Sequence, residues 1–264
     1  MPVWLYDLSP FKAAILMVAF TEVVSLIGLV LARRFLLPRF HYSEGVNEAI
    51  SGTVQAIGVF YGVTVGLIAV AVWNTNSSCA DLVSREATAI GSLYRDVGGY
   101  PEPLRSELRT DLRNYTVFVI EKAWPAQRKG EIPFEGARII DNLQAKLYAF
   151  EPTTPGVTAL HSETLRAFNN LVEARRLRVI AVDGGLSPMM WVVIWLGAAI
   201  SIGVAYFFKV EDWKLHAVLV SFIATFLALV IFLILINDKP FYGAVSVSSD
   251  PYKIVLERLI DAPK

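Results

Sequence analysis

Long apolar stretches alternate with charged ones along the chain, and the apolar stretches have one characteristic length. Four of them cover residues of about 13–33, 53–73, 188–208 and 216–236. A helix rises 1.5 Å per residue, so about 20 apolar residues match a hydrocarbon core of about 30 Å. The pattern therefore predicts an all-α integral membrane protein with four transmembrane helices.

The segment between the second and third spans, residues 74–187, has a different pattern. It holds 28 of the 48 charged residues, fourteen of each sign, so we expect it to lie outside the bilayer. Its apolar residues recur at helical spacing and are interrupted by Gly and Pro clusters, which predicts about four helices, two of them continuous with the flanking spans. The expected organisation is 1–73 with spans 1 and 2, a soluble helical module at 74–187, 188–236 with spans 3 and 4, and a C-terminal tail at 237–264.

Composition narrows the classes of function. The chain is 55% hydrophobic and 18% charged, and its 24 basic residues balance its 24 acidic ones, so nothing favours a nucleic-acid partner. One cysteine and three isolated histidines offer no metal cluster, and we expect the histidines in surface or interfacial positions. Signatures of enzymes, phosphate-binding loops and dinucleotide sites are absent from the sequence, so we expect no enzyme, no metal and no cofactor.

The membrane orientation rests on the positions of Lys and Arg near the span ends. Five lie in the short loops and seven on the face that carries both termini and the module. Basic residues are enriched on the cytoplasmic side, so this bias favours cytoplasmic termini and a cytoplasmic module.

Glu22 is the only ionisable residue inside the apolar part of any predicted span. A carboxylate at that depth is costly, about 2.5–3.5 kcal/mol on insertion scales, so it should face protein or water. It is a functional candidate, with proton coupling as one version. The alternative is a hydrogen bond to a neighbouring helix that serves packing.

The second span has two distinct faces. Gly58, Gly62 and Gly66 recur every four residues, a spacing that allows close approach of another helix and, as the alternative, could line a conduit. The opposite face carries hydroxyls and bulky apolar side chains, which suits a narrow pore wall with a hydrophobic constriction. The pore-lining candidates are Thr53, Ile57, Phe60 and Thr64. The alternative is that the Thr hydroxyls bond only to their own helix backbone.

A basic cluster precedes the third span. Arg175, Arg176 and Arg178 lie about ten residues before it. Such a cluster either binds anionic lipid headgroups, at about 1 kcal/mol per charge, or forms an electropositive ring at a channel vestibule.

Several short motifs, taken in order, resemble the bestrophin-like family of bacterial and plant membrane proteins. The likeness runs from about Asn47 to Ile260 and rests on Trp73-Asn74, Glu86-Ala87, Leu93-Tyr94-Arg95, Glu121, Trp124-Pro125, Arg175-Arg176-x-Arg178, Pro188, Trp191 and Asp238-Lys239-Pro240-Phe241-Tyr242-Gly243. That family is distantly similar to true bestrophins, which are pentameric anion channels with four spans per subunit and a pore formed by the second span.

The resemblance implies a homo-oligomer, with a pentamer expected, in a bacterial inner membrane. In the motif after span 4, Asp238, Pro240, Phe241 and Gly243 carry the likeness, whereas the acidic calcium-binding run of bestrophins is replaced by Ala-Val-Ser-Val-Ser-Ser at 244–249. Calcium gating of that kind is therefore not expected.

Three functional hypotheses follow from these observations. The first is an oligomeric channel, for anions by resemblance, with the second span lining the pore and small inorganic ions passing through it. The second is a non-conducting scaffold or sensor whose helical module binds a partner. The third is a proton-coupled transporter that uses Glu22, although the chain lacks the matched halves of inverted-repeat transporters.

Overall fold

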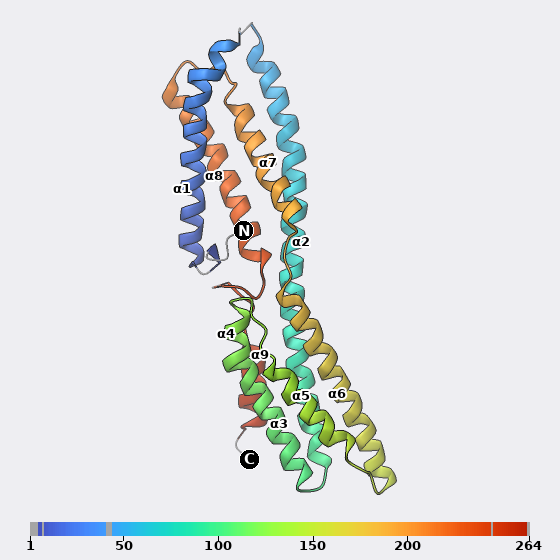
Figure 1. Ribbon diagram of the computed structural model, residues 1–264. Coiled ribbons are helices and arrows are strands. Elements are labelled where there is room, and N and C mark those ends of the chain that lie inside the picture. Colours follow the sequence, from blue (N-terminus) through green and yellow to red (C-terminus); the bar gives the residue numbers. More distant parts are fainter. Residues whose placement is uncertain (1–4, 7, 41–43, 244, 263–264) are drawn as a thin grey trace. The chain divides into compact units, whose positions relative to one another are not determined.

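Helices are the only regular secondary structure in the part of the chain that the computed structural model describes, residues 5–6, 8–40, 44–243 and 245–262 (Figure 1). Four helices are long and apolar enough to cross a membrane: α1 (Pro10–Leu31), α2 (Val46–Asp96), α7 (Pro188–Ala205) and α8 (Trp213–Asp238). The predicted fold class is therefore confirmed.

The chain divides into two compact units. We call Met1–Asn74 with Gly185–Asp238 the membrane unit, and Thr75–Gly184 with Lys239–Lys264 the helical module. The first half of α2 belongs to the membrane unit and the second half to the module, so the expected continuity of the second span with a module helix is correct.

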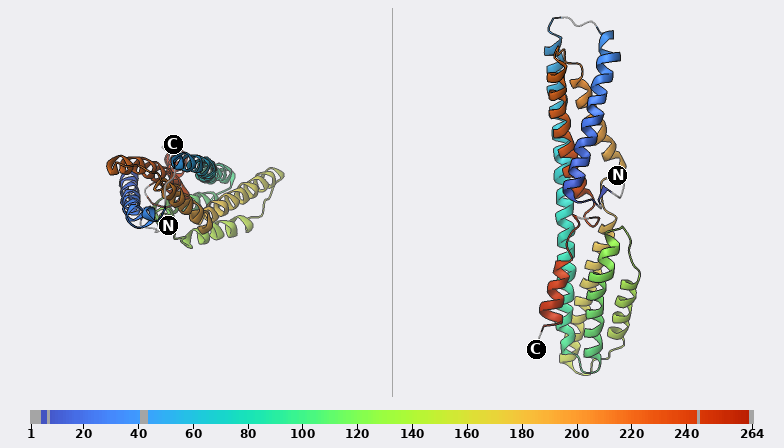
Figure 2. Two further views of the ribbon diagram at one scale, coloured as in Figure 1. Left: turned by 90° about the horizontal axis from the view of Figure 1, so that it is seen from above. Right: turned by 90° about the vertical axis from the view of Figure 1, so that its left-hand side faces the viewer.

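In the membrane unit, α8 packs against α1 and α7, as Figures 1 and 2 show. Its core is mostly aliphatic, with Leu29, Ile194 and Ala224 fully buried, and it also includes Trp191 of α7 and Val65 and Val72 of α2. The outward faces carry exposed Phe, Leu, Ile and Val side chains, as expected for helices whose solvent is lipid. Helix α1 continues into the π-helical η2 (Ala32–Leu36) and the 3-10 turn η3 (Leu37–Arg39).

The helical module packs the second half of α2 with several amphipathic helices around one core. These are α3 (Leu104–Phe118), α4 (Trp124–Gln127), α5 (Glu135–Tyr148), α6 (Pro155–Val182) and α9 (Asp250–Val255). The short element η4 (Val97–Gly99) joins α2 to α3, η5 (Val119–Ala123) joins α3 to α4, and η6 (Leu256–Ile260) continues α9. Each long helix buries residues three or four apart, such as Leu108, Leu112 and Tyr115 of α3.

Two features of the module differ from the sequence expectation. Helices α6 and α7 are not continuous, because Gly184 and Gly185, the latter at φ +152°, end the helical run before Pro188 begins the next one. The segment after the fourth span is also more than a tail. Phe241 and Tyr252 lie in the module core, and α9 runs beside α2 in the right-hand view of Figure 2.

Candidate functional site

Helix α2 uses only one of its faces within the membrane unit. Between Val54 and Trp73 only Val65 and Val72 are buried. The Tyr61 hydroxyl donates to the Ile194 carbonyl oxygen of α7 at 2.9 Å, and the Tyr61 ring lies directly over Gly197. The rest of this apolar stretch is partly or fully exposed, although its sequence is as hydrophobic as that of a buried helix.

The four pore-lining candidates are not equivalent in the structure. Phe60 is 75% exposed, and Thr53 and Thr64 are exposed beside it, whereas Ile57 is half-buried. The Thr53 hydroxyl donates to the Ala49 carbonyl oxygen at 3.0 Å and the Thr64 hydroxyl to that of Phe60 at 2.8 Å. Each hydroxyl oxygen keeps lone pairs but has already used its hydrogen.

The glycine face of α2 has no neighbour within the membrane unit. A Cβ atom built on Gly58, Gly62 or Gly66 would meet nothing within 4 Å. Gly197 and Gly28 contrast with them, because a Cβ there would collide with Tyr61 and Tyr206. Gly197 therefore lets a side chain of the same chain pack closely against α7. The α2 glycines leave room for a close neighbour, but no other described part of the membrane unit lies there.

Three further side chains lie open on α2 that the sequence did not single out. Val59, Val63 and Leu67 are 64%, 59% and 68% exposed and recur every four residues. At 100° per residue they project away from the Tyr61 and Val65 side that packs in the chain. Apolar side chains on a transmembrane helix carry no sequence signal that separates a pore wall from a lipid-facing surface, which is why these positions were missed.

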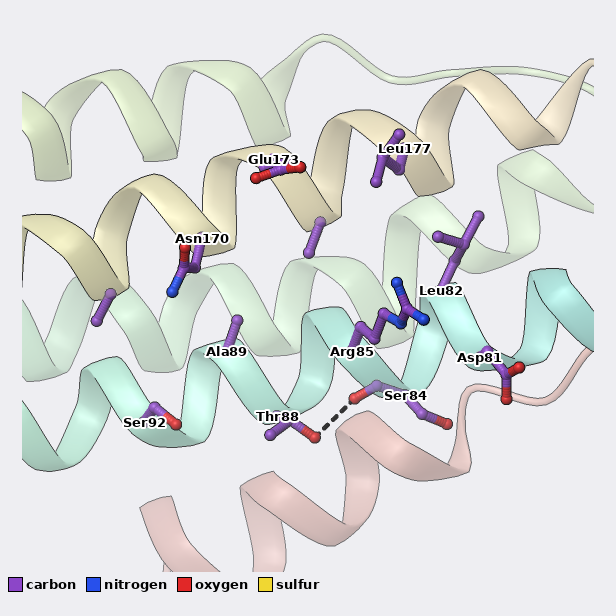
Figure 3. Close-up of a pocket in the computed structure, with 12 residues that line it drawn as sticks. Asp81, Leu82, Ser84, Arg85, Thr88, Ala89, Ser92, Asn170, Glu173 and Leu177 are labelled. Carbon is purple, nitrogen blue, oxygen red and sulfur yellow. Dashed lines mark hydrogen bonds between the residues drawn. The ribbon is translucent and has the colours of Figure 1, made fainter.

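In the helical module, α2 presents a polar face instead. A groove of about 640 Å³ lies between α2 and α6, and Figure 3 shows the side chains around it. Ser84, Thr88 and Ser92 line it from α2, and Asn170 and Glu173 from α6. The Thr88 hydroxyl donates to the Ser84 carbonyl oxygen at 2.8 Å, the contact drawn in Figure 3.

Glu22 makes a contact between two helices of the membrane unit. The Thr225 hydroxyl of α8 donates to Glu22 Oε1 at 2.5 Å, and Glu22 is half-buried. This is the hydrogen bond that the packing alternative anticipates.

The basic cluster is divided by its positions on α6. Arg176 is exposed and Arg175 partly buried, but Arg178 is only 2% exposed. The expectation that Arg178 faces headgroups or a vestibule is therefore wrong. The physical reason is the partner it finds inside the module, the fully buried carboxylate of Glu86.

The Arg178–Glu86 pair is the centre of a buried polar cluster. Arg178 Nε lies 2.6 Å from Glu86 Oε2, and Nη2 lies 3.2 Å from Oε1. Nη1 donates to Gln127 Oε1 at 2.9 Å, and the Tyr115 hydroxyl donates to Glu86 Oε1 at 2.6 Å. Burial, and next the charge of Glu86, raise the pKa of Tyr115 well above its ordinary value. The pair thus joins α2, α3, α4 and α6.

The motif after the fourth span has local structural roles in both units. In the membrane unit, Asp238 Oδ1 accepts from the Leu186 N–H at 2.6 Å. In the module, buried Phe241 packs edge-on against Trp124 with ring centroids 5.8 Å apart, and the Pro240 carbonyl oxygen accepts from the Val247 N–H at 2.7 Å. Gly243 adopts a φ of +66°, which favours glycine.

The remaining chemistry of the described residues is sparse. No three His, Cys, Asp or Glu side chains in that part of the chain gather as a metal ion would require. His161 Nδ1 lies 2.6 Å from the Tyr100 hydroxyl oxygen, and His41 lies outside the described residues. His216 is buried at the start of α8, so the surface position that was one of its two expected places is wrong.

Comparison with known proteins gives a family and a fold. The family model described as the Bestrophin-like domain matches residues 19–252. A crystal structure of a variant bacterial bestrophin homologue from Klebsiella pneumoniae is similar with a TM-score of 0.69 at 10% identity, covering 94% of this chain and 99% of that chain. Another crystal structure of a Klebsiella pneumoniae bestrophin homologue gives 0.68 at 10% identity, with 93% and 96% coverage.

A crystal structure described only as that of a membrane protein is also similar. It gives a TM-score of 0.70 at 11% identity, with 92% of this chain and 96% of that chain covered. At such low identity these likenesses show the fold alone. Among curated proteins none matches the chain significantly.

Proposed function

Because the chain belongs to the bestrophin-like family, we propose that it conducts anions as a homo-oligomeric channel in which α2 lines the pore. Family and fold support a membrane ion channel as the kind of function. The observation that carries the finer proposal is the state of α2, an apolar helix with one face packed on its own chain and the glycine and Phe60 faces open.

A ring of copies gives both open faces of α2 a use. Helices approach closely where glycines remove side chains, so the Gly58, Gly62 and Gly66 face contacts the neighbouring copy. The opposite face, with Thr53, Phe60 and Thr64, then turns toward the central axis. Cyclic symmetry creates a pore on that axis without any cavity inside one chain. Five copies is the number that the resemblance to the pentameric bestrophins favours.

Phe60 is the proposed constriction of this pore. A ring of phenyl groups forms a narrow apolar passage that can gate by dewetting. The hydroxyls of Thr53 and Thr64 offer weak sites for an anion on either side when they rotate from their own backbone carbonyl oxygens and donate to the ion. The exposed Val59, Val63 and Leu67 are the alternative lining, if α2 is rotated about its axis in the assembly.

The proposed orientation of the channel rests on the Lys and Arg residues near the ends of the spans. We place both termini and the module in the cytoplasm of a bacterial cell, with the spans in the inner membrane. Arg175 and Arg176 then attract anions to the cytoplasmic mouth.

Conductance measurements on matched variants test this proposal. Purified protein in planar bilayers should conduct, with reversal potentials that follow the anion gradient. Phe60→Ala should change conductance or open probability at least several-fold. Phe222→Ala removes an equally exposed phenyl group from α8 and should leave both unchanged.

Three outcomes would contradict different parts of the proposal. If folded, oligomeric protein gave no current in bilayers, the proposal that it conducts ions would be wrong. If the protein had a monomeric mass in a lipid-preserving detergent, the proposed ring of copies would be wrong. A Val63→Ala effect without a Phe60→Ala effect would keep the channel and reassign its lining.

A further inference from the structure

A second, smaller cavity lies at the end of the membrane unit where the spans are joined by short segments. Its volume is about 220 Å³, and its polar lining residues are Arg33 of η2, Lys209 and Glu211 of the α7–α8 connection, and His216 of α8. These residues belong to none of the faces of α2 discussed above, so the cavity requires an explanation of its own.

Arg33 is held in place on one side and unpaired on the other. Its Nη2 donates to the carbonyl oxygens of Val210 and Glu211 at 3.2 and 3.4 Å, and its Cζ lies 5.6 Å from the ring centroid of Trp213. Its Nη1 is buried without a hydrogen-bond partner in the described part of the chain. No described carboxylate lies within ion-pair distance of it. A buried cationic donor without an acceptor is costly, and an anionic ligand would supply both the missing acceptor and the opposite charge.

His216 contributes a second unpaired atom. Its side chain is 2% exposed, and its Nε2 lies 3.1 Å from the carbonyl oxygen of Ala205. A carbonyl oxygen only accepts, so Nε2 carries the hydrogen. The buried Nδ1 has no partner among the described residues. In the neutral ring Nδ1 accepts a hydrogen bond, and in the protonated ring it donates one.

Lys209 adds an exposed positive charge, and its main chain is held by hydrogen bonds to Asn47. Its main-chain N–H donates to Asn47 Oδ1 at 2.8 Å, and its carbonyl oxygen accepts from Asn47 Nδ2 at 3.1 Å. Its side chain is exposed and makes no ion pair with a described residue. Lys209 and Arg33 together outweigh Glu211, the one acid that lines the cavity, so the lining carries a net charge of +1 with His216 neutral.

We infer that this cavity binds a phosphate group that keeps one hydroxyl. Its anionic oxygens accept from Arg33 Nη1 and from the Lys209 ammonium. Its remaining P–OH donates to His216 Nδ1 in the neutral ring, and an oxygen accepts from Nδ1–H in the protonated ring. The share of one water in liquid is about 30 Å³, so the five heavy atoms of a phosphate fit a cavity of this size.

The chemistry is common to two sources, inorganic phosphate and the monoester headgroup of a lipid such as phosphatidate. The position at the end of apolar helices is open to either source, because headgroups lie at that level. A phosphodiester headgroup lacks the hydroxyl that His216 requires and should bind more weakly.

Binding to the full chain in a maltoside detergent, which contains no phosphate, tests the site directly. Calorimetric titration with inorganic phosphate should give one site per chain. Arg33→Gln should weaken binding at least tenfold and Lys209→Gln several-fold. Lys214→Gln, an exposed lysine a few residues away that does not line the cavity, should change nothing. Arg33 also holds the α7–α8 connection, so Arg33→Gln could misfold. In that case Lys209→Gln is the variant that tests the inference.

Sulfate and lipids separate the role of His216 and the source of the phosphate. Sulfate has no hydroxyl near neutral pH, so it should bind more weakly than phosphate, and His216→Gln should reduce that preference. In lipid nanodiscs, phosphatidate that competes with phosphate identifies the lipid source, and phosphate binding unaffected by phosphatidate identifies the free ion.

The opposite results would overturn the inference. One is that the wild type, Lys209→Gln and Lys214→Gln bind phosphate with equal affinity. The other is that the protein neither binds phosphate nor retains phosphatidate preferentially. Either result would mean that this cavity does not hold a phosphate group.

Discussion

Arg178 and Glu86 form a two-point contact inside the helical module, with Nε 2.6 Å from Oε2 and Nη2 3.2 Å from Oε1, and neither side chain reaches solvent. A buried ion pair contributes little net stability compared with an apolar pair of the same shape. The removal of one partner is different, because the other charge stays buried and unpaired.

Glu86→Gln should therefore lower the free energy of unfolding of the module by about 3–5 kcal/mol. The matched control is Arg113→Gln, which breaks the Arg113–Asp261 pair in the same module, where both side chains are exposed. Exposed pairs are screened by water, so this variant should unfold almost like the wild type. Denaturant unfolding followed by circular dichroism compares the two, and equal losses would show that the Glu86 environment is not apolar in solution.

Two tyrosines near this pair should respond differently to loss of their hydroxyls. Tyr115 donates to Glu86, so Tyr115→Phe should cost about 1.5–3 kcal/mol. The Tyr252 hydroxyl is buried without a hydrogen-bond partner in the described part of the chain, so Tyr252→Phe should leave the stability unchanged or raise it. The same unfolding measurement applies, and a larger loss for Tyr252→Phe would contradict the assigned contacts.

The same tyrosines predict alkaline sensitivity. Burial raises the pKa of Tyr115 and of Tyr252 well above about 10, the value of an unfolded chain. Their contribution to stability is therefore fully present below pH 10 and is lost as the pH rises from there toward the folded-state pKa values. Each phenol adds at most about 1.4 kcal/mol per pH unit to the decline.

Unfolding at pH 9, 10 and 11 measures this decline in detergent. The Tyr115→Phe/Tyr252→Phe double variant should show a shallower loss above pH 10 than the wild type. Parallel curves would mean that other groups cause the alkaline loss.

The open glycine face of α2 predicts an effect on assembly. Gly62→Leu places a bulky side chain where a neighbouring copy is proposed to approach, while the same position is open within one chain. The variant should fold but lose oligomeric mass in native mass spectrometry or light scattering. Gly203→Leu makes the same change in α7, where a Cβ also meets nothing within 4 Å, and serves as the control. An intact Gly62→Leu oligomer would place the interface elsewhere.

The membrane helices could be predicted because their signal is local. Lack of charge over about 20 residues defines a span without knowledge of its neighbours, and the helical spacing of Leu108, Leu112 and Tyr115 defines a module helix in the same way. The Gly184-Gly185 pair before Pro188 is a local signal too, and it ends α6 before α7 begins, so the predicted continuity of a module helix with the third span is wrong.

Partners far apart in sequence could not be predicted. Arg178 and Glu86 are 92 residues apart. Arg178 stands in a cluster of basic residues that is typical of a surface, and nothing near it in the sequence indicates a buried acidic partner. The contact between Glu22 and Thr225 spans 203 residues and was equally hidden. The exposure of Phe60 depends on which faces of α2 the other helices cover, a property of packing and not of the α2 sequence.

The place of Phe241 and Tyr252 in the module core has a consequence for how the protein is made. Helices α3 to α6 leave the ribosome early, but the core they share lacks these two rings until residue 252 has been synthesised. From the end of α6 at Val182 that takes 70 more residues, about 4–14 s at ordinary bacterial or eukaryotic elongation rates. The last two membrane helices, α7 and α8, are made during that interval, so the whole membrane unit has been synthesised before the module can close.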